Sequence, residues 1–274
     1  MRRWVQIASA LMGCLAGSAV ADDSGLRVLD TGVDASAWEA VGRLDIDGRG
    51  FCTGALIASD IVLTAAHCLF DKRSGAQVDP TRIEFQAGWR NGRASAYRQV
   101  KHAALHAEYI YSDEVTPQRV RHDVALLRLV RPIRNTTINP FETAVHPAKG
   151  ARVGVVSYGR SRAEAPSLQE FCEVLGRQEG VLITTCTVDF GSSGAPIFSF
   201  DSGAAIIVSV VSAKAEVEGQ KISLGTDLSG ALAAIHKALA RQNRSFVSAI
   251  PSVRQTTIEE SRSTMGAKFI RPVP

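Results

Sequence analysis

Short apolar runs separated by turn-forming residues dominate the chain from residue 40 to about residue 226. Each run is about four to eight residues long, is rich in Val and Ile, and is bounded by Gly, Asp, Ser or Pro, which is the pattern of β-strands. The clearest runs are 51–58, 61–66, 82–87, 124–130, 152–158, 181–185, 195–198 and 204–211. Because no helical pattern is interleaved with them, the region is predicted to be all-β, built as barrels or sandwiches.

The pattern changes at two places. A polar segment over 132–150 interrupts the strand-rich region and is predicted to link two β units. Apolar residues recur at helical spacing between 227 and 241, so one helix is predicted there. The tail over 242–274 is polar and mixed, and we expect it to be a flexible extension.

The first residues have the parts of a secretory signal peptide in the expected order. Arg2 and Arg3 form a basic start, an apolar stretch follows over 4–15, and Ala19-Val20-Ala21 is a small-x-small exit. This order predicts a signal peptide over 1–21, and therefore a protein exported to the periplasm or secreted.

Cysteine usage agrees with export. Of the five cysteines, Cys14 lies within the predicted signal peptide, in a weak lipoprotein cleavage pattern, so soluble export and lipid attachment both stay open. The remaining four are even in number and allow three disulfide pairings, which the sequence does not distinguish. A zinc site is disfavoured because no Cys-x-x-Cys pair occurs. The four are Cys52, Cys68, Cys172 and Cys186.

Composition narrows the class of protein further. The chain is 45% hydrophobic and 21% charged, as in ordinary globular proteins, and its net charge is only +4. Without a cluster of basic residues, no nucleic-acid partner is expected. No apolar run after the signal peptide approaches the roughly 18 residues that span a bilayer, so no membrane span is expected.

Three motifs carry candidate chemistry, in the order His, Asp, Ser. The first is the string Leu-Thr-Ala-Ala-His67-Cys68, in which an apolar strand leads through two small residues to a histidine. Histidine is the side chain whose unperturbed pKa suits a general base near neutral pH. In the second, Asp123 opens an apolar run, where a buried acid needs a hydrogen-bond partner such as a histidine N–H. Asp60 and Asp71 are rival candidates for that role.

The third motif is a glycine-flanked serine turn over 189–196, Asp-Phe-Gly-Ser-Ser-Gly-Ala-Pro. The glycines permit a tight turn that aims backbone N–H groups at one point. Ser193 is the candidate nucleophile, and the N–H groups of Gly191 and Ser193 are the candidate oxyanion hole. A plain Gly/Ser loop between two strands is the alternative for this string taken alone.

Together the three motifs resemble those of the trypsin/chymotrypsin-like serine peptidases, in particular their compact bacterial branch, over about residues 40–240. The resemblance implies two six-stranded antiparallel β-barrels with a C-terminal helix and an active site between them. It also implies a Cys52–Cys68 disulfide beside the histidine, and the leftover pair, Cys172 and Cys186, would then bridge within the second barrel. The expected organisation is a signal peptide over 1–21, a polar lead-in over 22–39, a first barrel over 40–135, a second barrel with the C-terminal helix over 136–241, and the extension over 242–274.

The chain also departs from the family pattern. Many relatives have an acid just before the nucleophile that pairs with a newly cut N-terminus, but here the residue is Ser192. The usual Ile-Val-Gly-Gly start is absent between residues 22 and 44 as well, so we hypothesise that activity does not depend on N-terminal cleavage. The resemblance points to Thr187, Ser212 and Lys214 as substrate-binding positions. Preference for a small, apolar or acidic substrate residue stays open.

These observations predict a serine endopeptidase with His67, Asp123 and Ser193 as its triad, acting on protein or peptide substrates through an acyl-enzyme. No metal or cofactor is required, and a monomer is expected. The non-enzymatic alternative is a catalytically silent homologue that serves as a secreted binding module. An α/β-hydrolase esterase is disfavoured because the Gly-x-Ser-x-Gly elbow is missing and the triad order differs.

Overall fold

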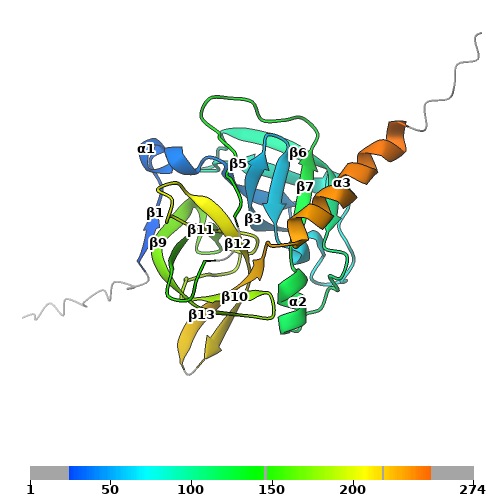
Figure 1. The fold of residues 1–274 in the computed structure, drawn as a ribbon. Coiled ribbons are helices and arrows are strands. Elements are labelled where there is room, and N and C mark those ends of the chain that lie inside the picture. The colour runs from blue at the N-terminus through cyan, green and yellow to red at the C-terminus, as the bar shows by residue number, and fades with distance from the viewer. Residues whose placement is uncertain (1–24, 145–146, 218, 248–274) are drawn as a thin grey trace, which may run out of the picture.

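The computed structural model describes residues 25–144, 147–217 and 219–247, and it contains two β-barrels (Figure 1). The first is a closed, antiparallel, six-stranded barrel in which β2 pairs with both β3 and β5 and so completes the ring. Its strands are β2 (Val41–Ile46), β3 (Gly50–Ala58), β4 (Ile61–Thr64), β5 (Ile83–Ala87), β6 (Ala96–Leu105) and β7 (Ala125–Leu129).

The second barrel also has six antiparallel strands, and it closes because β8 pairs with both β9 and β11. A further short strand, β1 (Leu26–Val28), pairs with the outer edge of β9. The strands of the second barrel are β8 (Arg152–Gly159), β9 (Arg162–Gln178), β10 (Val181–Thr184), β11 (Pro196–Ser199), β12 (Ile206–Val217) and β13 (Gln220–Asp227). The all-β fold of two six-stranded barrels with a C-terminal helix is therefore confirmed.

Each barrel has its own apolar interior. In the first, Leu44, Phe85 and Leu127 are completely buried, and in the second Val155 and Ile197 are. Burying one such side chain contributes about 1.5–3 kcal/mol. The predicted apolar runs supply four of these five residues, all except Leu44 on β2, which explains why these runs form barrel strands.

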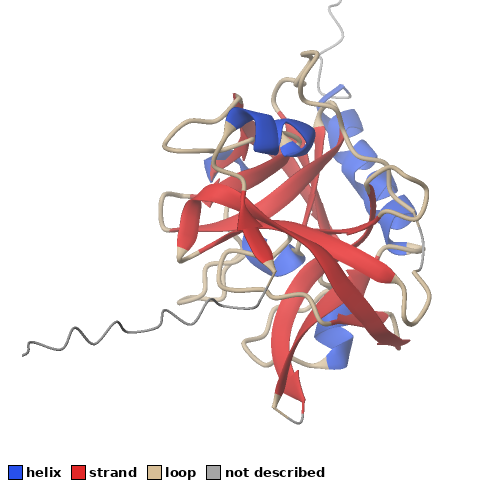
Figure 2. Ribbon diagram, turned by 90° about the vertical axis from the view of Figure 1, so that its left-hand side faces the viewer, coloured by secondary structure: helices blue, strands red, loops and turns tan. Residues whose placement is uncertain are grey.

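Except for the buried short helix Ala66–Leu69, the helices lie on the outside of the strands (Figure 2). Helix α3 follows the second barrel but packs on β6 and β7 of the first (Figure 1), and Gln242 Nε2 donates to the carbonyl of Ala103 at 3.1 Å. The short elements are α1 (Gly32–Ala35), η1 (Ser36–Trp38), η2 (Ala66–Leu69), η3 (Pro80–Arg82) and α2 (Pro117–His122), and the long helix is α3 (Ala231–Val247).

The segments around the barrels differ in detail from the sequence expectation. Helix α3 begins at Ala231 rather than at 227 and ends at Val247 rather than at 241, so the start of the predicted extension is helical. The predicted polar lead-in contains β1, α1 and η1. The predicted signal peptide and the extension beyond residue 247 lie outside the described residues. Within the described ranges, no helix combines the length and the apolar character needed to cross a bilayer.

Candidate active site

His67 and Asp123 form a buried pair at the edge of the first barrel. His67 lies in η2, directly after β4, and Asp123 follows the last residue of α2. His67 Nδ1 lies 2.6 Å from Asp123 Oδ2, and the His67 backbone N–H donates to Asp123 Oδ1 at 2.8 Å. With Nδ1–H donating to the carboxylate, Nε2 keeps the lone pair that a general base needs.

The second barrel also contributes to this pair. Ser212 on β12 donates its hydroxyl proton to Asp123 Oδ2, and Thr226 Oγ1 on β13 donates to the Asp123 carbonyl at 3.1 Å. Asp123 is completely buried. Burial raises the pKa of Asp123, but the neighbouring His67 charge and the hydrogen bonds from His67 and Ser212 outweigh it, so this pKa lies below its ordinary value. The carboxylate therefore stays ionised.

The rival acids lie elsewhere. Asp60 pairs with Arg128 at 2.6 Å. Asp71 accepts hydrogen bonds from the Arg73 and Ser74 amides in its own loop. Neither is hydrogen-bonded to His67, so of the three candidate acids Asp123 is the one that the fold pairs with the histidine.

The serine turn between β10 and β11 is shaped by glycines and held by the first barrel. Gly191 and Gly194 have φ of +98° and +76°, which strains any residue with a side chain. Thr53 on β3 donates its N–H to the Ser193 carbonyl at 2.9 Å and its hydroxyl to the Gly191 carbonyl at 2.8 Å. Within the described residues, the Gly191 and Ser193 amides donate to no protein acceptor, so both remain available to a ligand.

His67 and Ser193 line the same cavity, whose volume is about 920 Å³. Gly191, Phe51 and Phe190 also line it, so the imidazole of one barrel and the serine turn of the other share one open space. No hydrogen bond joins His67 Nε2 to Ser193 within the described part of the chain. Catalytic hydrogen bonds are often long in proteins without substrate.

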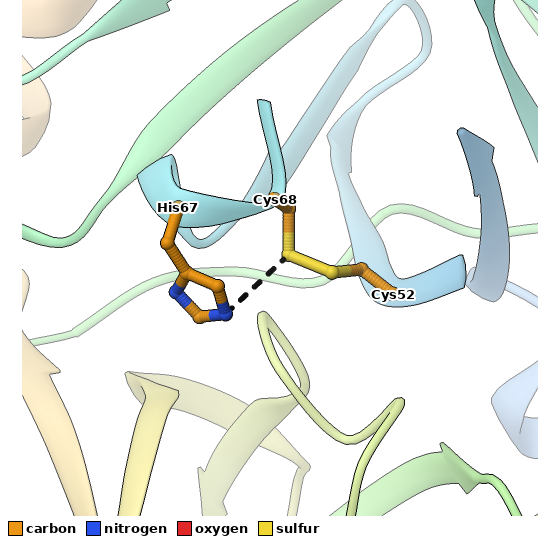
Figure 3. A group of neighbouring side chains, drawn as sticks. All are labelled: Cys52, His67 and Cys68. Carbon is orange, nitrogen blue, oxygen red and sulfur yellow. Dashed lines mark hydrogen bonds between the residues drawn. A yellow bond between two sulfur atoms is a disulfide. The ribbon is translucent and has the colours of Figure 1, made fainter. Parts of the chain in front are cut away.

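A disulfide supports His67 from one side. Cys52 on β3 and Cys68 on η2 are bonded to each other, and Cys68 Sγ lies 4.0 Å from His67 Nε2 (Figure 3). The two sulfurs and the imidazole are close enough together to suggest a metal site. A disulfide offers no thiolate, however, so this donor set does not suit zinc. The other disulfide, Cys172–Cys186, lies in the second barrel, and both pairings are those that the resemblance implied.

Two of the three predicted substrate-binding positions line a pocket, and the third lies in the loop between β10 and β11. Ser212 and Lys214 line a smaller pocket of about 260 Å³ that also contains His67 and Ser193. Thr187 does not line either pocket, and its amide donates to Gln169 Oε1 at 2.7 Å.

Sequence reasoning missed three residues that surround the serine turn. Thr53 holds two of its carbonyls, Phe190 presents a half-exposed ring in the cleft, and Arg162 reaches Ser192 from beneath. The only signal for Phe190 was its place in the Gly-rich motif. Thr53 and Arg162 act across long sequence separations, and no local pattern marks such contacts.

The fold and the paired His67 and Asp123 beside a serine turn define the class of serine peptidases with two β-barrels. The chain belongs to the trypsin family, since the family's sequence model, described as Trypsin, matches residues 31–235. The resemblance that the three motifs suggested is therefore confirmed.

Curated relatives match only parts of their own length. Human mannan-binding lectin serine protease 1 is 30% identical over 144 residues, covering 47% of this chain and 19% of that protein. Trypsin epsilon of Drosophila erecta is 29% identical over 126 residues, covering 44% of this chain and 46% of that protein. The chain thus spans less than half the length of the curated relatives it matches.

Solved structures show the same fold at low sequence identity. A Glu endopeptidase in complex with MPD superimposes with a TM-score of 0.65 at 18% identity, covering 80% of this chain and 98% of that one. The protease Anisep from Arthrobacter nicotinovorans gives a TM-score of 0.59 at 17% identity, covering 75% of this chain and 97% of that one. These similarities concern the fold alone.

Proposed function

We propose that the chain is a serine endopeptidase that hydrolyses peptide bonds through an acyl-enzyme. The observation that carries the proposal is the buried His67–Asp123 pair, in which His67 lines the same cavity as Ser193. Ser193 Oγ attacks the scissile carbonyl while His67 Nε2 accepts its proton, and Asp123 stabilises the imidazolium that forms. His67 then returns the proton to the leaving amine.

The free amides of Gly191 and Ser193 would bind the oxyanion of the tetrahedral intermediate. Donors that are already oriented lower the barrier without reorganisation, and losing one costs about 10²–10³ in kcat. Water admitted to the cleft then attacks the acyl-enzyme, with His67 again as the base, and releases the second product.

Labelling with a fluorophosphonate probe tests this proposal. We expect the wild-type protein and a Ser202→Ala control, which changes an exposed loop serine, to be labelled equally. Ser193→Ala should not be labelled and should not cleave peptides. A folded wild-type protein that neither reacts with the probe nor cleaves a diverse peptide library would instead establish the silent binding module.

We propose that the protein is exported and loses residues 1–21. The basic, apolar and small-residue segments of the N-terminus support this, as do two disulfides, which form in oxidising compartments. N-terminal sequencing of protein recovered from the periplasm or the medium should begin at Asp22. Recovery of a lipid-modified Cys14 would show anchoring instead.

We propose that activity needs no newly cut N-terminus. Leu26–Val28 pairs with the outer edge of β9, and the residue before the nucleophile is Ser192 rather than an acid. Protein carrying a short peptide tag before Asp22 should keep the kcat of the untagged protein. Activity that appears only after the tag is cleaved off would contradict this.

We propose further that substrates carry an acidic side chain near the scissile bond. Three cations surround the half-exposed Phe190 ring: Lys72 Nζ lies 5.7 Å, Arg160 Cζ 4.7 Å and Lys214 Nζ 4.5 Å from its centroid. The ring faces both pockets beside Ser193. One carboxylate, Asp189, lies 3.6 Å from Lys214, and a substrate carboxylate would add charge complementarity to this cluster.

Matched peptides that differ only as Glu against Gln, or Asp against Asn, test the preference. We expect kcat/KM to be about tenfold higher for the acidic member and the difference to shrink as salt is added. Lys214→Gln should reduce the difference, whereas Lys237→Gln on the exposed face of α3 should not. Equal cleavage of both peptides would exclude the preference and leave the proposed hydrolysis unaffected.

A further inference from the structure

Arg162 points from the β8–β9 hairpin toward the underside of the serine turn. It is the first residue of β9 and lies opposite Gly159 on β8. Its side chain folds back across Gly159, where a Cβ atom would come within 3.0 Å of Arg162 Nε. The missing side chain at position 159 therefore makes room for the guanidinium.

The guanidinium bonds to two buried serines. Arg162 Nη1 donates to the Ser157 carbonyl at 2.7 Å, and Nη2 lies 3.1 Å from Ser157 Oγ and 3.3 Å from Ser192 Oγ. Both serines are completely buried. Ser192 directly precedes the candidate nucleophile, so Arg162 reaches the residue next to Ser193.

Ser192 Oγ is the centre of the network beneath the turn. It accepts from Arg162 and from the Asp189 amide, which lies 3.2 Å away. It is also 3.2 Å from the Tyr158 carbonyl and from Ser157 Oγ, either of which accepts its proton. A hydroxyl group accepts two hydrogen bonds and donates one, so this hydroxyl has its full set of partners.

The charge of Arg162 has no carboxylate at ion-pair distance within the described ranges. Asp189 is the acid whose charge acts on Arg162, but its carboxylate forms an ion pair with Lys214 instead. Burial lowers the pKa of Arg162, while Asp189 partly opposes that effect. A part-buried cation without a counter-ion is costly.

We propose that Arg162 is a positioning residue for the serine turn, holding Ser192 so that the Gly191 and Ser193 amides keep their orientation. The inference rests on the proposed serine peptidase activity. Arg162 lines neither pocket and has no hydrogen bond to Ser193 in the described part of the chain, so it acts through the Ser192 hydroxyl. The alternative is an anchor of the β8–β9 hairpin that affects folding alone.

Kinetics of variants separate the two roles. We expect Arg162→Met to lower kcat about 10- to 100-fold, a decrease no larger than the one caused by removing an oxyanion donor. KM should change by less than about threefold. Arg162→Lys should restore part of kcat. Arg152→Met, which changes an exposed arginine at the start of β8, is the matched control and should keep full kcat.

The coupling between Arg162 and Ser192 is the sharper test. Ser192→Ala should lower kcat and the rate of fluorophosphonate labelling, and adding Arg162→Met should cause little further loss because both act through one hydrogen bond. The proposal would be overturned if the decrease in kcat of the double variant equalled the product of the two single decreases. It would also be overturned if Ser192→Ala kept full kcat. If Arg162→Met does not fold, Ser192→Ala alone tests the proposal, because a decrease in its kcat and labelling rate supports it and full kcat overturns it. Wild-type protein without activity would refute the proposed function instead.

Discussion

Single residues in the serine turn are constrained by lack of space as well as by backbone angle. Gly194 has a left-handed φ, and a Cβ atom there would overlap Thr64 Oγ1 and the Thr53 carbonyl oxygen. Gly203 has a similar φ of +80° in a turn with nothing within 4 Å of its Cβ position. Comparing Gly194 with Gly203 therefore separates the cost of backbone strain from the cost of steric overlap.

Gly194→Ala should therefore destabilise the protein by about 3 kcal/mol or more and abolish peptidase activity, because strain and overlap add. Gly203→Ala should cost only about 1 kcal/mol, the strain alone. Urea denaturation followed by circular dichroism measures both. Equal losses in the two variants would show that space at position 194 is not the constraint.

The candidate site was predictable from sequence as far as its local motifs reach. His67, Asp123 and Ser193 each lie in a short string whose composition marks a strand end or a tight turn, and the fold pairs the first two. Thr53 and Arg162 could not be predicted, because Thr53 contacts the turn across 138 positions of sequence and Arg162 across 30, and each belongs to an ordinary strand. Their contacts exist only after both barrels have formed.

At the scale of elements, strand β3 joins the two barrels. Thr53 on this strand is completely buried, donates its hydroxyl to the Gly191 carbonyl, and accepts from the Tyr158 amide at 3.1 Å. One side chain of the first barrel thus satisfies two backbone groups of the second. Docking of the barrels and the shape of the serine turn depend on the same hydroxyl.

Thr53→Val should lower the free energy of unfolding by about 2–4 kcal/mol, because it leaves the part-buried Gly191 carbonyl and the buried Tyr158 amide without this partner. It should also lower kcat, since the Gly191 carbonyl is released. Thr53→Ser keeps the hydroxyl and should retain most of the free energy of unfolding and most of kcat. Denaturation curves and steady-state kinetics measure them, and a Val variant as stable as the Ser variant would contradict this role.

The apolar pattern of the sequence predicted the positions of strands and helices better than it predicted where they end. The apolar run over 124–130 became β7, and the run over 152–158 became β8. Helix α3 continues past Arg241, and Gln242 just beyond it donates to the Ala103 carbonyl on β6, a tertiary contact that local polarity does not reveal. The same limit applies to β1, which is short and becomes a strand by pairing with β9.

At the scale of the whole molecule, a histidine cluster beside Asp123 links stability to pH. His106 stacks on His122 with ring centroids 4.5 Å apart, and His106 Nδ1 accepts from the Glu108 amide at 3.2 Å. Burial and the nearby His122 charge lower the pKa of His106, while Glu108 partly opposes them. The folded protein thus favours neutral His106.

Because the pKa is lowered on folding, the unfolded chain binds this proton first, at its ordinary pKa of about 6.5. The stabilising contribution is complete above that pH and is lost as pH falls through the lower folded-state value. We expect the free energy of unfolding to decrease from about pH 7.5 to pH 5, and to decrease less in His106→Asn. An identical pH dependence in the variant would exclude His106 as the cause.

Helix α3 follows the second barrel and packs on the first, and none of its described side chains, over 231–242, lines either pocket. Immobilising the protein on a solid support through a linker placed after Val247 would therefore leave the cleft open to large substrates. A linker fused ahead of Leu26 would instead begin beside β9, within the barrel that carries Ser193. For display or resin coupling, the carboxyl-terminal end is the better choice.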